Sequence, residues 1–215
     1  MTFMNVRTAA TAAGLIVALA GVRAGAQQEP QVTAIRDDAT RTVVMEQLSI
    51  AKERGVPREP LLSKALEGVA KNATSSTIRA AMSALQKRLS RAHDLLGPSA
   101  TVDELSAGAD ALSVGVPDKT LKLMRAAAPR RSIAMEIGVL TELVARKVAP
   151  KKASQMILDL MARGATGAQL TALNAAVQSD VAAGLTPEAA LERHGRGILS
   201  LLPPPTPVFN GNPRR

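Results

Sequence analysis

The chain has 215 residues, a formal net charge of +9 and no cysteine, tryptophan or tyrosine. The lack of cysteine excludes disulfide frameworks, thiolate nucleophiles, lipid attachment at cysteine and cysteine-based metal sites. Aromatic residues, which sheets favour, amount to only 1% of the chain, whereas alanine is abundant. The composition therefore predicts an all-α fold whose core consists of Leu, Ile, Val, Met and Ala.

The first 26 residues have the three-part pattern of a secretory signal peptide. Arg7 supplies an early positive charge, an aliphatic stretch follows, and Ala24-Gly25-Ala26 provides the small side chains that a signal peptidase requires. The apolar stretch is short for a membrane span, although an uncleaved anchor is the alternative. Cleavage after Ala26 leaves 189 residues with a net charge of +7 and no further transmembrane candidate. We therefore expect a periplasmic or secreted protein, and a bacterial origin fits an exported chain without disulfides.

The rest of the chain divides into a helical domain and two polar ends. Residues 27–36 predict a flexible mature N-terminus, and the Pro-rich residues 203–215 predict a disordered tail. Residues 37–202 show helical periodicity throughout. The Gly-Pro segment at 97–100 is either a subdomain boundary or a tight turn within one core. One domain is the preferred interpretation, because both halves contain the same kind of helix.

About eight helices are predicted in this domain. The clearest covers residues 76–96, where apolar residues recur at spacings of three and four and Gly97-Pro98 follows as a stop signal. The next helix begins with a capping box, in which Thr101 and Glu104 satisfy each other's backbone N–H groups. The apolar stripes of the later helices are formed by Leu105, Ala109 and Leu112, by Ile133, Ile137, Leu140 and Val144, by Ile157 and Leu160, and by Leu170, Leu173 and Val177.

One turn pattern recurs between helices: Gly, then Val, Leu or Ala, then Thr or Pro. Glycine in the left-handed conformation closes one helix, the aliphatic residue folds back onto the core, and Thr or Pro begins the next helix. The pattern occurs at Gly55, Gly115, Gly164 and Gly184, with a glycine-free variant at Lys147. We expect a compact bundle or a short array of helices. The bundle is preferred, because a solenoid would show a tighter period over more copies.

Catalytic signatures are absent from the sequence, including His-Glu-x-x-His, Gly-x-Ser-x-Gly, the phosphate-binding loop and the dinucleotide fingerprint. His93 and His194 lie on or beside apolar stripes, which favours packed histidines over a general base. Asp37 and Glu188 stand where helices begin, a position at which negative charge stabilises the helix. We therefore predict no catalytic residue, no cofactor and no metal site, and an enzyme is the less favoured class.

Positive charge is the main functional indication. Lysines and arginines cluster in three stretches, near residues 87–91, 125–131 and 146–152, and Arg125 and Arg146 belong to the second and third of these. Such a surface suits an envelope protein or an anionic polymer or lipid surface, whereas the alternative is solvated helix faces that only maintain solubility. Nucleic acid is disfavoured, because aromatic side chains for base stacking are missing. The candidate contact residues are Lys87, Arg88, Arg91, Arg130, Arg131, Lys147, Lys151 and Lys152.

The combined prediction is an exported, non-enzymatic helical binding or scaffold protein of the bacterial cell envelope. Its basic helix faces would contact the partner, whose identity the sequence leaves open. Two alternatives remain. One is a small envelope hydrolase or lyase without a recognisable motif. The other is a periplasmic chaperone-like protein with an Ala- and Met-rich groove for exposed apolar segments.

Overall fold

A computed structural model describes residues 32, 33 and 35–204 of the chain. The predicted signal peptide (1–26), residues 27–31 of the predicted N-terminal segment and residues 205–215 of the Pro-rich tail lie outside the described residues. The described part is all-helical without strands, which confirms the predicted fold class. In the same part of the chain, none of the helices combines the length and the apolar character needed to cross a bilayer. The nine helices bounded within the described residues are α2 (Asp38–Glu53), α3 (Arg58–Ala70), α4 (Ser75–Leu96), α5 (Val102–Ser113), α6 (Asp118–Ala127), α7 (Ala134–Ala145), α8 (Pro150–Ala162), α9 (Gly167–Ala182) and α10 (Pro187–Leu201).

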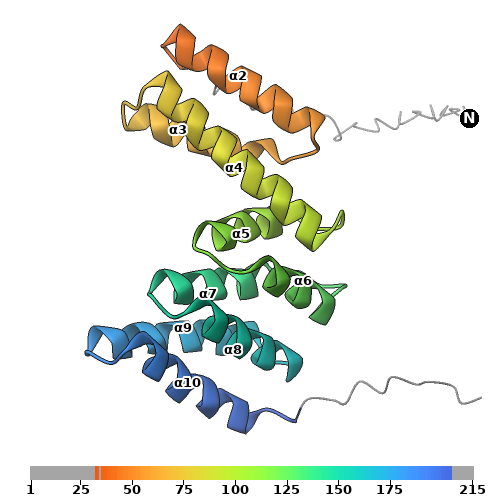
Figure 1. Ribbon diagram of the computed structural model, residues 1–215, viewed down its shortest axis with the longest axis vertical. Coiled ribbons are helices and arrows are strands. Elements are labelled where there is room, and N and C mark those ends of the chain that lie inside the picture. Colours follow the sequence, from red (N-terminus) through yellow and green to blue (C-terminus); the bar gives the residue numbers. More distant parts are fainter. Residues whose placement is uncertain (1–31, 34, 205–215) are drawn as a thin grey trace, which may run out of the picture.

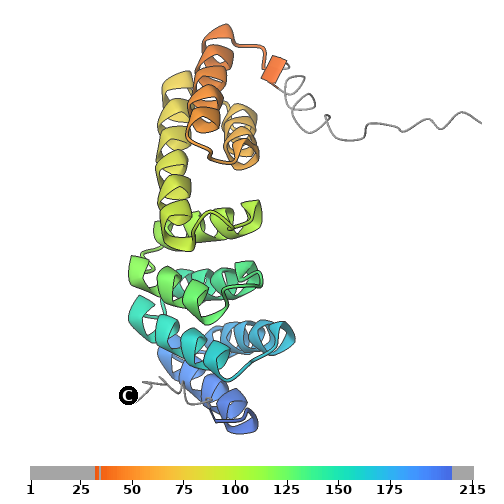
Figure 2. The same cartoon turned by 90° about the vertical axis from the view of Figure 1, so that its right-hand side faces the viewer.

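The helices from α3 onward alternate between two layers (Figure 1). Helices α4, α6, α8 and α10 form the front layer in this view, and α3, α5, α7 and α9 lie behind them; Figure 2 shows the same two layers from the side. Neighbours within a layer are in contact, α4 with α6, α6 with α8 and α8 with α10 in front, and α5 with α7 and α7 with α9 behind. Helix α2 covers one end by packing on α3 and α4. Of the two predicted arrangements, the structure has the short array of helical hairpins.

The repeat of this array is a hairpin and not a single helix. Helices α5, α7 and α9 begin at residues 102, 134 and 167, so their starts recur at intervals of 32 and 33 residues. Helices of 10 to 16 residues are too short to span a large common core. Each hairpin therefore buries its apolar side chains against the hairpins before and after it, which produces a stack.

Six turns in the described chain share one geometry. The residue that follows the helix cap has a positive φ, and the next N–H donates to the carbonyl five residues earlier at 2.9–3.1 Å, as in the Schellman motif. The residue that makes this bond is aliphatic each time, and its side chain is buried or half-buried against the helices. These donors are Val56, Ala73, Val116, Val148, Ala165 and Leu185. This turn joins successive helices at six of the eight connections among the described helices; the α4–α5 and α6–α7 connections differ.

Helix α4 connects the two apolar clusters found among the described residues. Its first half packs on α2 and α3, and its second half packs on α5 and α6. Gly108 of α5 allows a close crossing, because a Cβ at this position would lie only 3.0 Å from the Cβ of Ala92 on α4. The segment at 97–100 is thus the turn between two tightly packed helices. The described residues before α2 also contribute two buried side chains, Val32 and Ile35, to the cluster around α2 and α3.

The left-handed turn positions give opposite predictions for two substitutions. Gly115 has φ +91 with open space around its Cα, so Gly115→Ala should lower the free energy of unfolding by about 1 kcal/mol through backbone strain alone. Lys147 holds the equivalent position with φ 72 and an exposed side chain, so Lys147→Gly should raise it by about 1 kcal/mol. Urea denaturation measures both values. Changes of the same sign would contradict this account of the turns.

Candidate interaction surface

The two layers differ in charge. Helices α4, α6 and α8 of the front layer contain nine lysines and arginines and three acidic residues. Helices α5, α7 and α9 of the back layer contain six acidic residues and neither lysine nor arginine. Because successive helices alternate between the layers, helices of like charge come to lie side by side. The fold thereby converts an alternation along the chain into two faces of different charge.

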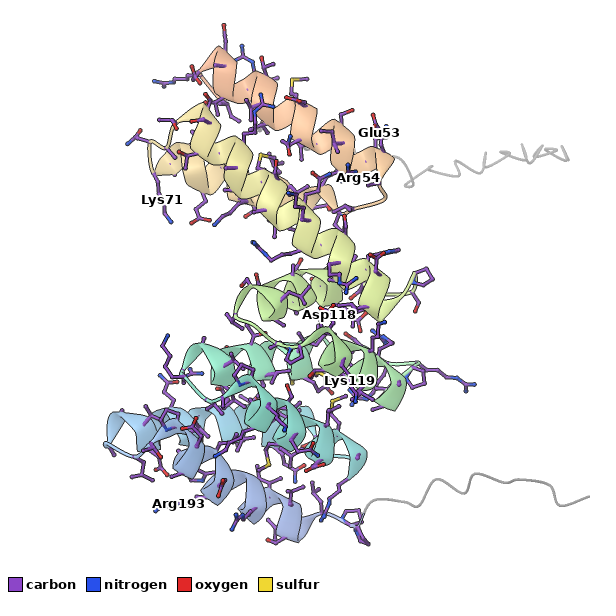
Figure 3. All side chains as sticks on the ribbon, in the orientation of Figure 1. Glu53, Arg54, Lys71, Asp118, Lys119 and Arg193 are labelled. Atoms are coloured by element: carbon purple, nitrogen blue, oxygen red, sulfur yellow. The ribbon has the colours of Figure 1, made fainter. Side chains whose placement is uncertain are left out.

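Seven of the exposed or half-buried cationic side chains on α4, α6 and α8 define the basic face. On α6, Leu121 and Met124 are fully buried, and Lys119 and Lys122 are exposed on the other side of the helix. Figure 3 labels Lys119 on this front helix. The same division between buried and exposed sides holds in α4 and α8. The basic face consists of Lys87, Arg88 and Arg91 on α4, Lys119 and Lys122 on α6, and Lys151 and Lys152 on α8.

Little of this positive charge is neutralised within the described part of the protein. Arg91 forms an ion pair with Asp118, which joins α4 to α6. The Nζ of Lys152 lies 3.9 Å from the Oε1 of Glu192 on α10, a distance that adds little in water. The other five members have no ion pair or side-chain hydrogen bond with any described residue. The basic face thus presents mostly uncompensated charge.

The remaining predicted contact residues lie outside the basic face. Arg130 is exposed in the linker between α6 and α7, and Arg131 in the same linker pairs with the buried Glu136. Lys147 is exposed in the turn that leads into α8. The structure therefore brings five of the eight predicted residues onto one face, and places the other three in turns.

Two arginines from the predicted basic runs have structural roles instead. Arg125 turns inward and pairs with the buried Glu104. Arg146 pairs with Glu142 at 3.1 Å and donates to Asn174 at 2.8 Å, which ties α7 to α9. The guanidinium of Arg125 therefore serves a buried ion pair, and that of Arg146 serves the contact between α7 and α9 within the back layer.

Sequence reasoning missed Lys119 and Lys122, which lie at the centre of the basic face. Helix α6 has only 10 residues and a short apolar pattern, so periodicity alone is a weak signal there. The turn at Gly115 followed by Leu121 and Met124 was the available indication of a helix with outward-facing lysines at these positions.

A buried carboxylate holds α6 in place. Glu104 is 2% exposed; its Oε2 accepts the N–H of Thr101 at 2.8 Å, as the capping box predicted, and its Oε1 accepts the N–H of Ile133 at 2.9 Å. The same Oε1 pairs with Arg125, whose guanidinium also donates to two carbonyls of the α6–α7 linker. Burial raises the pKa of Glu104, but the hydrogen bonds from Thr101, Ile133 and Arg125 outweigh it and hold the pKa below 4.5. One side chain thus joins the start of α5, the end of α6 and the start of α7.

The histidines show no catalytic arrangement among the described residues. The Nε2 of His194 lies 2.9 Å from the Oδ2 of Asp180, and Arg193 reaches the same oxygen at 3.3 Å, so this cluster links α9 to α10. His93 is half-buried on α4. The described chain also contains no group of three or more His, Asp and Glu residues that could hold a metal ion. One hollow of about 560 Å³ lies where α2 and α4 begin, and neither histidine lines it.

Comparison with protein-family models, characterised proteins and solved structures finds no match to this chain. Its function is therefore inferred from the charge and geometry of its surface.

Glu104→Gln should lower the free energy of unfolding by about 3 kcal/mol, because it leaves Arg125 largely buried without a counter-ion. The matched control is Glu192→Gln, which removes an exposed carboxylate near Lys152 and Arg196 and should cost less than about 0.5 kcal/mol. Urea denaturation at neutral pH compares the two variants. Equal losses would show that the buried pair contributes no more than a surface pair.

The lowered pKa of Glu104 also predicts a pH dependence. A carboxylate whose pKa is lower in the folded state stabilises the fold fully above the unfolded-state value, here about 4.5, and this stabilisation is lost as the pH falls through the folded-state pKa. The free energy of unfolding of the wild type should therefore fall more steeply than that of Glu104→Gln between about pH 5 and about pH 2. Parallel curves would contradict the assignment to Glu104.

Proposed function

We propose that this chain is an exported, non-enzymatic helical binding or scaffold protein of the bacterial cell envelope, and that it contacts an anionic partner through the basic face. The observation that carries the proposal is the uncompensated charge of α4, α6 and α8 in one layer of the array. Stacked helical hairpins offer long continuous side surfaces, a feature that repeat proteins commonly use for binding.

The distribution of charge argues against a purely solubilising role. A surface that only maintains solubility mixes both signs, whereas this front layer concentrates one sign on three adjacent helices. Lys119 and Lys122 are three residues apart on one helix, a spacing at which like charges repel. The folded state therefore loses some stability by holding these residues together, and an anionic partner would offset that loss.

The N-terminal sequence supports the location part of the proposal. Its charged start, aliphatic stretch and closing Ala-Gly-Ala match a cleavable export signal. The proposed cleavage after Ala26 falls before the first described residue, Val32, so the basic face and both apolar clusters belong to the mature chain. Export would bring the basic face to envelope surfaces that carry anionic groups.

The proposal predicts processing followed by salt-sensitive retention. The protein recovered from the exporting cells should begin at Gln27, as N-terminal sequencing would show, and should bind the envelope fraction of those cells. Binding should weaken as NaCl rises, because ions screen exposed charges over about 8 Å at physiological ionic strength. Lys119→Gln/Lys122→Gln should weaken it further.

The matched control is Lys64→Gln/Lys71→Gln, which removes one lysine of α3 and the lysine that caps its C-terminus, both outside the basic face. This variant has the same net charge as Lys119→Gln/Lys122→Gln. It should bind the envelope fraction like the wild type. Binding to the envelope fraction that changes neither with salt nor with the basic-face substitutions would overturn the binding part of the proposal. An unprocessed N-terminus in a cytosolic fraction would overturn the location.

A further inference from the structure

The basic face extends in two dimensions. Helices α4, α6 and α8 lie side by side, and in Figure 2 their outer edges follow one line along the array. Packed helices are separated by about 8–10 Å, so the cations spread over about 20 Å across the three helices. They also spread along each helix, as Lys119 and Lys122 do on α6. A flat anionic surface can meet all three helices at once, whereas a single linear polymer follows one path among them.

We propose that the anionic partner is the headgroup surface of a membrane containing anionic phospholipid, and that the basic face lies against it. This inference rests on the proposed function and names the partner class of the same face.

The side chains of the face suit mobile headgroups. Five of its seven cations are lysines, whose ammonium groups act as point charges on flexible stems and need no bidentate geometry. Lys87, Lys119, Lys122 and Lys151 have no described partner that would fix their ammonium groups in advance. A specific phosphate pocket would instead hold its donors in place through neighbouring side chains.

The contact would be peripheral. Leu123, 43% exposed beside Lys119 and Lys122, is the only large exposed hydrophobic residue within the described helices α4, α6 and α8. These three helices contain no aromatic residue that could anchor in the interface. Binding to the membrane surface must therefore depend mainly on charge, and added salt should release the protein.

The test measures co-sedimentation of the processed protein, purified from the exporting cells, with lipid vesicles. One set contains phosphatidylglycerol and phosphatidylcholine in equal amounts, and the other contains phosphatidylcholine alone. The wild type should bind only the anionic set, and about 0.5 M NaCl should release it. Each lysine removed should weaken binding about fivefold, so Lys119→Gln/Lys122→Gln should weaken it about 25-fold.

A second double variant tests whether the outer helices of the basic face also contact the membrane. Lys87→Gln/Lys151→Gln removes one lysine from each outer helix of the face and should weaken vesicle binding to a similar degree. The control Lys64→Gln/Lys71→Gln should bind within about twofold of the wild type, because these lysines lie on α3 and at its C-cap, outside the basic face. Unfolding curves check that all variants are folded, which is expected since every substituted side chain is exposed or partly exposed.

Equal binding of the wild type to both vesicle sets would overturn the inference. Undiminished binding by both double variants, Lys119→Gln/Lys122→Gln and Lys87→Gln/Lys151→Gln, would also overturn it. So would failure to bind anionic vesicles. If the wild type then still binds the envelope fraction through the basic face in a salt-sensitive way, the partner is an acidic protein or wall polymer, and the proposed function stands. If binding to the envelope fraction is also unaffected by the basic-face substitutions, both proposals fail.

Discussion

A single backbone hydrogen bond recurs at the turns that build this molecule, from an N–H to the carbonyl five residues earlier. This bond forms only when the residue between the helix cap and the donor adopts a positive φ. That residue is glycine at most of the turns. The bond reverses the chain and directs the donor's aliphatic side chain onto the helices. Each turn thus contributes both to the direction of the next helix and to the core. This coupling operates at six of the eight connections among the described helices and so underlies much of their alternation between two layers.

The alternation of helices between the two layers determines which helices become neighbours. Because α5 and α7 pass behind, α4 contacts α6 and α6 contacts α8 in front, although other helices separate them along the chain. Polar contacts between these neighbours then fix their relative positions. Thr120 of α6 donates to Ser154 of α8 at 3.1 Å in a buried position, and Glu104 fixes the end of α6 from behind. The surface that carries the charge is therefore positioned by buried hydrogen bonds.

Helices, turns and caps were predictable because local chemistry determines them. The capping box at Thr101 and Glu104 forms as expected, and the turn pattern at Gly55, Gly115, Gly164 and Gly184 appears at each of these positions. These features depend on residues within about five positions of one another. Stacking into an array was harder to predict, because the hairpin period appears only when two helices and both turns are counted together.

The composition of the surface was less predictable, because proximity along the chain is a poor guide to which face a charge occupies. Arg125 and Arg130 are five residues apart, yet one is drawn inward by Glu104 and the other stays exposed. That difference depends on a carboxylate 21 residues before Arg125, which the sequence presents only as a helix cap. Lys119 and Lys151, by contrast, are far apart in sequence and share one face because their helices, α6 and α8, pack side by side in the front layer.

The charges of the last helix support the proposal that the side of the array, and not its end, is the contact surface. A stack of hairpins leaves an uncovered face on its terminal helix, and an apolar face there would recruit further copies. Helix α10 instead presents Glu192, Arg193 and Arg196 outward, where they form ion pairs among themselves and with Asp180 and Lys152. Charges on α10 are mostly paired, whereas five of the seven cations of the basic face have no described partner. Pairing suits a surface that only meets water. Unpaired charge on adjacent helices lowers the stability of the fold unless a counter-charge arrives from outside, and for that reason the front layer is where a partner is expected.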